Sequence, residues 1–222
     1  MVIKMFLLSS VAKIYTENQY KKLAIVKPEL VETSYIRIAN ILKRGEDCAF
    51  EIKGSLPLDS IALFPLNVEI GYLLFILNTS PTQFNMFDGK MNVLTHIRLN
   101  KKKISSLKIP VVDEREQRYF VIARNLKEEA RKMMTKSTKD SHMAEISYGV
   151  FANLCDSLAI ELYFKDYLEE EGVEIFKYWK KTVDENLNIG DFDAFFRSLL
   201  EQTSELRNQL MKLRMIPQKL KR

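Results

Sequence analysis

Three consecutive lysines, Lys101–Lys103, form the most basic point of the chain. Lysine ammonium groups bind phosphate oxygens, and each such contact adds affinity that depends on salt and not on base sequence. Just before the lysines, an expected strand carries Thr95, His96 and Arg98, whose side chains could reach base edges, and arginine to guanine is the commonest such pairing. The candidate DNA-binding residues are therefore Lys90, Thr95, His96, Arg98, Lys101, Lys102 and Lys103. For any single lysine, solvation of a loop is the alternative interpretation, so the hypothesis rests on the cluster.

No pattern typical of a catalytic site competes with this cluster. The chain lacks the glycine-rich phosphate and dinucleotide loops, the nucleophile elbow and the HExxH zinc motif. His96 and His142 are the only histidines, and neither has a cysteine or carboxylate at metal-ligand spacing. Pairs of carboxylates stand at expected helix starts, where capping explains them, namely Asp113 with Glu114 and Asp191 with Asp193. We expect no enzyme, no metal site and no cofactor. A free-standing nuclease is disfavoured because no acidic cluster suited to magnesium is evident.

Length and composition are those of an ordinary globular protein. A chain of 222 residues, 46% of them hydrophobic, fits one α+β domain, alone or with a helical appendage. Cys48 and Cys155 lie far apart without CxxC spacing, which indicates a reducing compartment. The apolar run Met5 to Leu8 is too short for a signal peptide, and eighteen apolar residues never occur together. We expect a cytoplasmic protein with no membrane span.

Charge is segregated along the chain. Basic and acidic residues cancel over 1–89, whereas 90–140 carries fourteen basic and six acidic residues. The next segment, 141–201, carries five basic and thirteen acidic residues, and the last, 202–222, carries six basic residues and one acidic residue. A basic central block is the electrostatic footprint expected for a phosphate backbone. The alternative is that the acidic block covers the basic one within the fold.

Short β-branched and aromatic runs predict the strands of the N-terminal half. The expected strands are Leu7–Val11, Leu23–Val26, Tyr35–Ile38, Cys48–Ile52 and Val93–Leu99. From Ile70 the apolar side chains crowd too closely for one amphipathic face, so we expect a buried helix that ends near Asn78. Asn100 should then cap a short basic turn.

Helical periodicity dominates the rest of the chain. A long amphipathic helix is predicted over Asp113–Met134, with Asp113 as its N-cap, and the polar stretch Thr135–Ser141 as a linker. We therefore expect domains at 1–134 and 143–216. A last helix, Asp191–Met215, should carry a heptad seam for a coiled-coil partner or second copy, formed by Phe196, Leu199, Leu206, Leu210 and Leu213. Packing of this helix on its own domain is the alternative.

Three landmarks in this order resemble the target-recognition domains of bacterial restriction–modification systems, as in type I specificity subunits. The matching residues are Leu77, Asn78 and Ser80 at a helix end, then Leu107, Ile109 and Pro110, then Glu116 and Gln117 at a helix start. Upstream, Ser34 to Ile41 resembles a strand of the same subunits. Val150 to Ile175 is similar to a segment of fused restriction–adenine-methyltransferase enzymes.

The resemblance implies a mixed-sheet recognition domain followed by a long helix and a helical region. It also implies a specificity subunit that binds double-stranded DNA and directs a separate adenine-methyltransferase or nuclease subunit. The chain departs from fused enzymes because the Asp/Asn-Pro-Pro-Tyr/Phe motif and a visible S-adenosylmethionine loop are absent. With room for one recognition domain, it would be a half-length subunit or detached module, and a homodimer would be needed to read a bipartite site. The alternative is a protein-interaction module without direct DNA contact.

Overall fold

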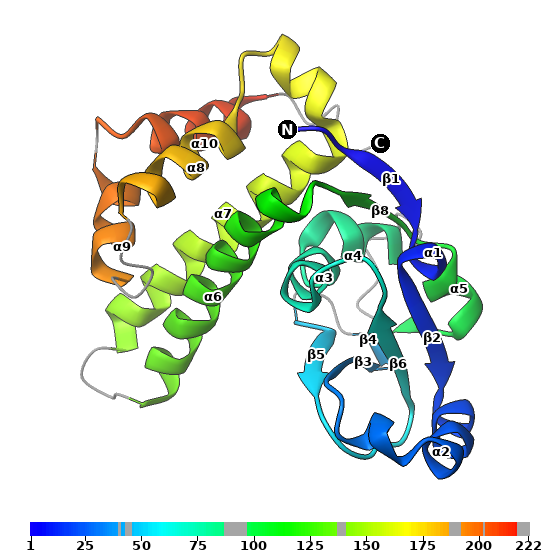
Figure 1. The fold of residues 1–222 in the computed structure, drawn as a ribbon. Helices are drawn as coiled ribbons and strands as arrows, with labels where there is room; N and C mark the ends of the chain where they lie inside the picture. Colours follow the sequence, from blue (N-terminus) through cyan, green and yellow to red (C-terminus); the bar gives the residue numbers. More distant parts are fainter. Residues whose placement is uncertain are drawn as a thin grey trace. The chain divides into compact units, whose positions relative to one another are not determined.

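The fold is described from a computed structural model of the chain (Figure 1). The structure describes residues 1–39, 41–42, 46–86, 97–136, 141–186, 192–201 and 203–216. Contacts divide the chain into two compact units, Met1–Gln117 and Arg118–Arg222, here called the N-terminal and C-terminal units. The first combines antiparallel strands with short helices and the second is helical, so the predicted α+β class is confirmed.

A four-stranded antiparallel sheet lies at the centre of the N-terminal unit, in the order β2-β6-β3-β5. Its strands are β2 (Ala12–Thr16), β6 (Ser60–Pro65), β3 (Tyr35–Ala39) and β5 (Ala49–Ile52). Two small ribbons complete the strands, β1 (Lys4–Leu7) with β8 (Lys108–Val111) and β4 (Ile41–Leu42) with β7 (Ile97–Arg98). We expected a mixed sheet, but every strand pair that the structure describes is antiparallel.

Two predicted strands are confirmed and one is cut short. Tyr35–Ile38 falls within β3, and Cys48–Ile52 largely forms β5, which pairs with β3 in the register Arg37 to Phe50. The expected strand Leu7–Val11 is wrong beyond its first residue, because β1 ends at Leu7 and Leu8–Val11 forms the turn α1. The expected strand Val93–Leu99 lies mostly outside the described residues, with β7 covering Ile97–Arg98.

The predicted strand Leu23–Val26 is wrong, because these residues belong to helix α2 (Glu17–Val26). Thr16 and Gln19 form a capping box that starts the helix, with each side chain accepting from the other's backbone N–H. Tyr20 fixes the helix to the unit, with 2% of its surface exposed. These contacts outweigh the β-propensity of Ile25 and Val26, which is a weak preference that context overrides. The 3₁₀ turn η1 (Pro28–Val31) follows.

Helix α3 (Ile70–Leu77) is the buried helix that we predicted, and Gly71 through Leu77 are all buried. Asn78 caps its end and also holds the start of β5. The Cys48 and Ala49 N–H groups both donate to Asn78 Oδ1 at 2.9 Å, and Asn78 Nδ2 donates to the Ala49 carbonyl at 2.8 Å. Helix α4 (Ser80–Met86) follows at once, and its Gln83 donates to the Glu46 carbonyl at 2.9 Å.

The Ile-Pro and Glu-Gln landmarks have structural roles. Pro110 lies in β8, and its carbonyl accepts from the Tyr72 hydroxyl of α3 at 3.1 Å. Gln117, 2% exposed, accepts from the Glu69 N–H at 2.9 Å and donates to the Val112 carbonyl at 3.1 Å. Its amide therefore ties the entry to α3 to the start of helix α6 (Glu114–Lys136).

The boundary between the units falls within α6, whereas we expected it after residue 134. Asp113 caps this helix as predicted, because Asp113 Oδ1 accepts from the Arg115 N–H at 3.0 Å. From Arg118 onward the helix belongs to the C-terminal unit. The Tyr119 carbonyl accepts from Trp179 Nε1 at 2.8 Å, and the Phe120 ring stacks on Phe176 at 4.9 Å. The linker predicted at Thr135–Ser141 lies mainly outside the described residues, and helix α7 begins at Ser141.

The C-terminal unit consists of α6 from Arg118 and four further described helices. They are α7 (Ser141–Glu170), α8 (Ile175–Glu185), α9 (Phe192–Leu200) and α10 (Glu205–Met215). Trp179 of α8 is fully buried, and its ring centroid lies 5.7 Å from that of Phe195 of α9. No helix within the described residues combines the length and the apolar character needed to cross a membrane.

The single helix predicted over Asp191–Met215 is wrong, because the chain breaks into α9 and α10. Arg207 donates to the Leu200 carbonyl at 2.6 Å, and the Ser204 side chain accepts from the Arg207 N–H, so both new helix ends are satisfied. The seam residues Phe196, Leu199, Leu206 and Leu210 are buried, whereas Leu213 is half-buried. Because the chain itself covers most of the seam, it does not form one exposed coiled-coil surface.

Glu161 of α7 is the most deeply buried carboxylate of the C-terminal unit that the structure describes, with 4% of its surface exposed. It accepts from the Phe176 N–H at 2.7 Å, at the start of α8. Gln209 of α10 accepts from the Glu174 N–H at 3.0 Å beside it. Burial raises the pKa of Glu161 to about 7, against the lowering effect of the N–H groups of Phe176 and Ile175.

We predict that Asn78→Ala destabilises the N-terminal unit by about 1–3 kcal/mol, the cost of leaving a buried hydrogen-bonding group unsatisfied. The effect should be local to β5, because Cys48 and Ala49 lose their acceptor. Amide hydrogen exchange should therefore quicken at these two residues. Asn85→Ala, at an exposed position of α4, is the control and should change neither rate. Unchanged exchange at Cys48 and Ala49 in the Asn78 variant would contradict this role.

We predict that the C-terminal unit loses stability as pH rises through about 7, because Glu161 must then ionise while buried. The folded pKa lies above the ordinary value of 4.5, so the favourable contribution is complete below pH 4.5 and is lost through pH 7. Glu161→Gln should abolish this loss, which is on the order of 3 kcal/mol at 1.36 kcal/mol per pKa unit. Denaturant unfolding at several pH values measures it. Glu145→Gln, at an exposed position of α7 and not among the groups that shift the pKa of Glu161, should keep the wild-type pH dependence, and identical profiles for Glu161→Gln and wild type would refute the assignment.

Candidate nucleic-acid interface

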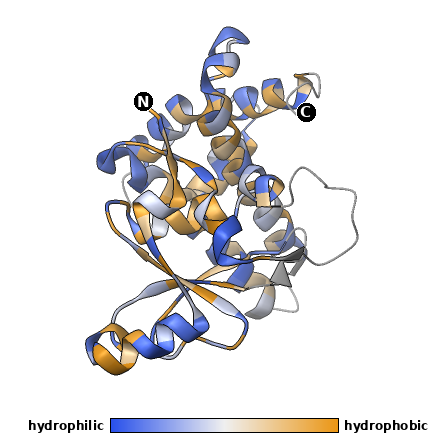
Figure 2. Cartoon of the chain, turned by 90° about the vertical axis from the view of Figure 1, so that its right-hand side faces the viewer, coloured by the Kyte–Doolittle hydropathy of each residue, from blue (hydrophilic) through white to orange (hydrophobic). Residues whose placement is uncertain are grey.

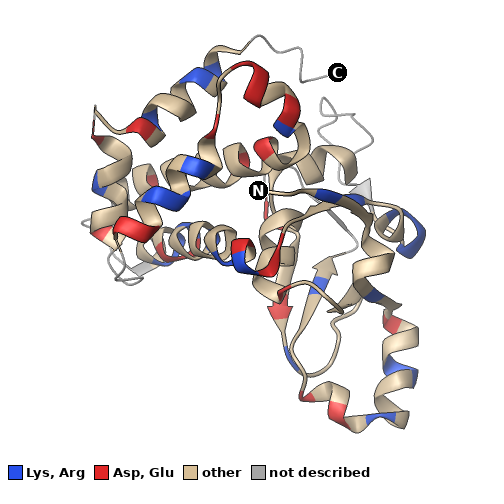
Figure 3. Ribbon diagram, turned by 45° about the horizontal axis from the view of Figure 1, so that its top comes forward, with Lys and Arg blue, Asp and Glu red and all other residues tan. Residues whose placement is uncertain are grey.

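The three lysines predicted to bind DNA form a short capped helix, α5 (Lys101–Ser105). Asn100 Oδ1 accepts from the Lys103 N–H at 2.9 Å, as the sequence predicted. Leu99 and Ile104 are buried on either side of the lysines and fix the turn to the unit. Lys102 is exposed, and Figure 3 shows α5 as a blue turn. The polar turn is thus held in place by its cap and by apolar anchors.

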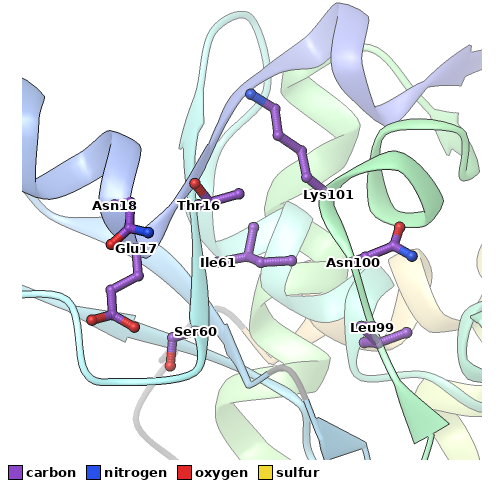
Figure 4. A pocket seen from close by; sticks show the side chains of 8 residues that line it. All are labelled: Thr16, Glu17, Asn18, Ser60, Ile61, Leu99, Asn100 and Lys101. Carbon is purple, nitrogen blue, oxygen red and sulfur yellow. The ribbon is translucent and has the colours of Figure 1, made fainter.

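A cavity of about 280 Å³ lies beside α5 (Figure 4). Its lining comes from the start of α2, from the start of β6 and from the segment that enters α5, and consists of Thr16, Glu17, Asn18, Ser60, Ile61, Leu99, Asn100 and Lys101. Six of these eight side chains are polar. Such a lining offers both hydrogen-bond donors and hydrogen-bond acceptors, which suits a polar ligand better than an apolar one.

Lys101 links α5 to the start of α2. Its Nζ donates to Gln19 Oε1 at 2.9 Å and lies 6.0 Å from the ring centroid of Tyr15. The same Gln19 oxygen accepts from the Thr16 N–H at 3.1 Å, within the capping box. The two helix starts are therefore joined by one amide oxygen.

Glu17 places a carboxylate in the cavity lining, and Asp59 adds a second one just before Ser60. Glu17 accepts from Lys21 Nζ at 2.5 Å and from the Asp59 N–H at 3.0 Å. Chiefly through the hydrogen bond from Lys21, these contacts hold the pKa of Glu17 below its usual value. Since Lys21 offsets the charge of Glu17, this carboxylate adds little negative charge beside Lys101.

Arg37 adds a further cation next to the cavity. It lies half-buried on β3, and its Nε donates to Ser60 Oγ at 2.8 Å. Ser60, 1% exposed, lines the cavity. The guanidinium thereby fixes the orientation of a polar cavity wall.

The structure describes only part of the predicted DNA-binding set. Lys101, Lys102 and Lys103 lie together on α5. The backbone of Arg98, in β7, pairs with that of Ile41 in β4, and the side chain of Arg98 lies outside the described part. Lys90, Thr95 and His96 lie outside the described residues altogether.

The sequence does not predict the residues that α2 brings to the cavity, Glu17 and Asn18, because the strand propensity at the end of this helix hides its start. The pattern Thr16-x-x-Gln19 could have identified the helix start, since serine or threonine followed three residues later by glutamate or glutamine is a capping-box signature. The β-branched Ile25 and Val26 that follow favour a strand on propensity alone.

The other part of the basic block, on α6, has acidic neighbours in its own unit. Arg118 lies 4.0 Å from Asp184, Arg131 pairs with Glu128, and Lys132 pairs with Glu129 at 3.4 Å. These pairs are largely exposed and weak individually, but they offset part of the positive charge of the helix. Nowhere in the described ranges do three His, Cys, Asp or Glu side chains gather where they could hold a metal ion.

We predict that Asn100→Ala loosens α5 by about 0.5–2 kcal/mol, because loss of an N-cap leaves an orphan N–H group. Amide exchange at Lys103 should quicken, since its N–H is the group that Asn100 accepts from. Asn100→Ser keeps a capping oxygen and should retain most of the protection. Equal protection of Lys103 in the alanine variant and the wild type would show that the cap does not hold the lysines in place.

Comparison of the chain with protein-family models, with curated proteins and with solved structures finds no match. Function is therefore inferred from the residues and their geometry.

Proposed function

We propose that this chain is the sequence-specific DNA-recognition component of a restriction–modification or related defence system. The observation that carries the proposal is the lysine helix α5, capped by Asn100 and set at the rim of a polar cavity. Lysines fixed at such a rim can hold phosphates, while the polar lining and its neighbours offer groups for base edges. DNA recognition needs both kinds of contact on one rigid surface.

The landmark residues support the resemblance to target-recognition domains in a physical way. Asn78, Pro110 and Gln117 each make hydrogen bonds that join separate elements of the N-terminal unit. Residues that join elements in this way have a structural role, which is the role expected of the landmarks in the family pattern. They place α3 and the start of α6 and leave DNA contact to α5 and its surroundings.

In this proposal the chemistry belongs to partners. The chain would select the DNA site in the cytoplasm, where the buried cysteines Cys48 and Cys155 stay reduced. A separate adenine methyltransferase, with a nuclease subunit, would modify or cut the DNA. Reading a bipartite site would require two copies of the chain. The heptad residues, being mostly buried in their own unit, are not the surface that joins them.

The test is duplex binding by the triple variant Lys101→Ala, Lys102→Ala, Lys103→Ala. Affinity for duplex DNA should fall about tenfold or more for all sequences alike, because lysine–phosphate pairs carry no sequence information. The slope of log affinity against log salt should become shallower by about 0.9 for each phosphate that the variant no longer neutralises. Fluorescence anisotropy over a series of salt concentrations measures both quantities.

A control with the same change in charge is available on α8. Lys177→Ala, Lys180→Ala, Lys181→Ala removes three exposed lysines from the C-terminal unit and should leave the salt slope nearly unchanged. Equal losses of duplex affinity in the two triple variants would indicate a general effect of net charge. No duplex binding by the wild type at low salt, with or without its methyltransferase partner, would refute the proposal.

A protein-interaction module is the second candidate function. The charge pairs of α6 favour it, because they satisfy part of the basic block without DNA. The exposed methionines of α10, Met211 at 51% and Met215 at 83%, are also typical of adaptable protein contacts. This candidate predicts that the α5 lysines are dispensable for binding the partner, which the same triple variant tests in a pull-down with the methyltransferase.

A further inference from the structure

We propose that α2 is the element that reads base edges in a DNA groove, with Asn18, Lys22, Ile25 and Val26 as specificity-determining residues. The inference rests on the proposed function and assigns the sequence preference to a helix outside the predicted DNA-binding set. In this division α5 holds phosphates and α2 distinguishes base pairs.

The outward face of α2 carries an unusual set of exposed side chains. Asn18, Lys22 and Ile25 stand at i, i+4 and i+7, so they lie on one face of the helix. All three are exposed, Ile25 to 80%, and Val26 next to it is exposed to 75%. Figure 2 shows the end of α2 in orange, where these aliphatic residues lie. Two adjacent aliphatic side chains in water lose the stabilisation that burial would give, and contact with a partner would restore it.

The residue types on this face match those that read DNA directly. Asparagine can bond adenine in a bidentate manner, lysine can donate to guanine, and aliphatic carbons contact the thymine methyl group. An α-helix fits the major groove, where each base pair shows a distinct pattern of donors, acceptors and methyl groups. The mixed polar and aliphatic face of α2 is therefore suited to a groove and poorly suited to a plain phosphate surface.

Charge favours a nucleic acid as the occupant. The segment Glu17–Lys27 contains three lysines and one glutamate, and that glutamate is paired with Lys21. The hydrogen bond from Lys101 to Gln19 joins α2 to the lysines of α5. Positive charge thus extends over both helices, whereas Glu29 and Glu32 follow beyond α2, where the surface for DNA should end.

The helix is held rigidly, as a reading element must be. The Tyr20 hydroxyl donates to the Gly54 carbonyl at 2.6 Å, and the Tyr35 hydroxyl donates to the same oxygen at 3.1 Å. The two rings lie 5.1 Å apart, and Gly54 adopts a φ of 89°, which a residue with a side chain would rarely tolerate. The capping box fixes the start of the helix. Little order is lost on binding when the reading face is already in place.

The experiment is selection of preferred sites from random duplex DNA by the wild type and by Asn18→Ala and Ile25→Ala. Each variant should lose discrimination at one or two base pairs by roughly fivefold to a hundredfold, the value of one good base contact. Its affinity for non-preferred DNA and its salt slope should stay close to those of the wild type. Asn18→Arg should move the preference at the affected pair from adenine to guanine, an outcome that misfolding cannot imitate.

Matched controls lie in the same unit at the far end of β6. Leu66→Ala and Asn67→Ala remove an exposed aliphatic and an exposed polar side chain away from α2, and they should leave the preferred site unchanged. If the α2 variants select the wild-type site, or lose affinity for all sequences equally as the α5 variant does, α2 is not the reading element. The proposed function would still stand in that case. If the wild type binds no duplex at all, the proposed function itself fails.

Discussion

The burial of α3 is the constraint on which the N-terminal unit depends. A helix whose residues Gly71–Leu77 are all excluded from water cannot leave polar groups at its ends to solvent. At the entrance the Gln117 amide accepts the Glu69 N–H, and at the exit Thr79 Oγ1 donates to the Ile76 carbonyl at 2.8 Å. Asn78 then extends this exit into the sheet through two hydrogen bonds with Ala49 of β5 and one with Cys48 just before it. Side-chain amides suit this task because each offers both a donor and an acceptor.

The position of the candidate interface follows from that arrangement. α3 supports β5, which pairs with β3, and β6 joins β3 to β2. Two strand ends then deliver the interface, since β2 leads into α2 at the Thr16 cap and β6 begins with Ser60 and Ile61 at the cavity wall. Helix α5 reaches the same place through Leu99 and its cap, Asn100. The contacts to DNA in our proposal are therefore carried by elements that the central sheet holds in fixed register.

The sequence predicts those parts of the fold in which local and tertiary preferences agree. The crowded apolar run of α3 has no solvent-facing alternative, and Asn100 and Asp113 are caps whose chemistry is local. Prediction from the sequence fails where a short polar signal competes with a stronger apolar pattern. The Thr16–Gln19 box starts a helix that continues through the β-branched Ile25 and Val26, and Ser204 interrupts a heptad pattern that is continuous in the sequence. A break costs little at Ser204, because Arg207 and Ser204 satisfy both helix ends. For the interface, only Lys101–Lys103 could be foreseen, since α2 reaches the cavity through the sheet.

The bond from Lys101 to Gln19 could suggest that this lysine is already occupied and unable to hold a phosphate. An ammonium group has three donors, however, and Gln19 accepts only one of them. A neutral amide also leaves the full positive charge in place, whereas a carboxylate partner would cancel it. Holding the long side chain in one position further lowers the entropy cost when a phosphate binds. The same oxygen caps α2 through the Thr16 N–H, so the phosphate-holding and base-reading elements are placed relative to each other by one hydrogen-bond acceptor. A displacement of either helix would therefore shift the other, which is the coupling that reading a base in register with its phosphate requires.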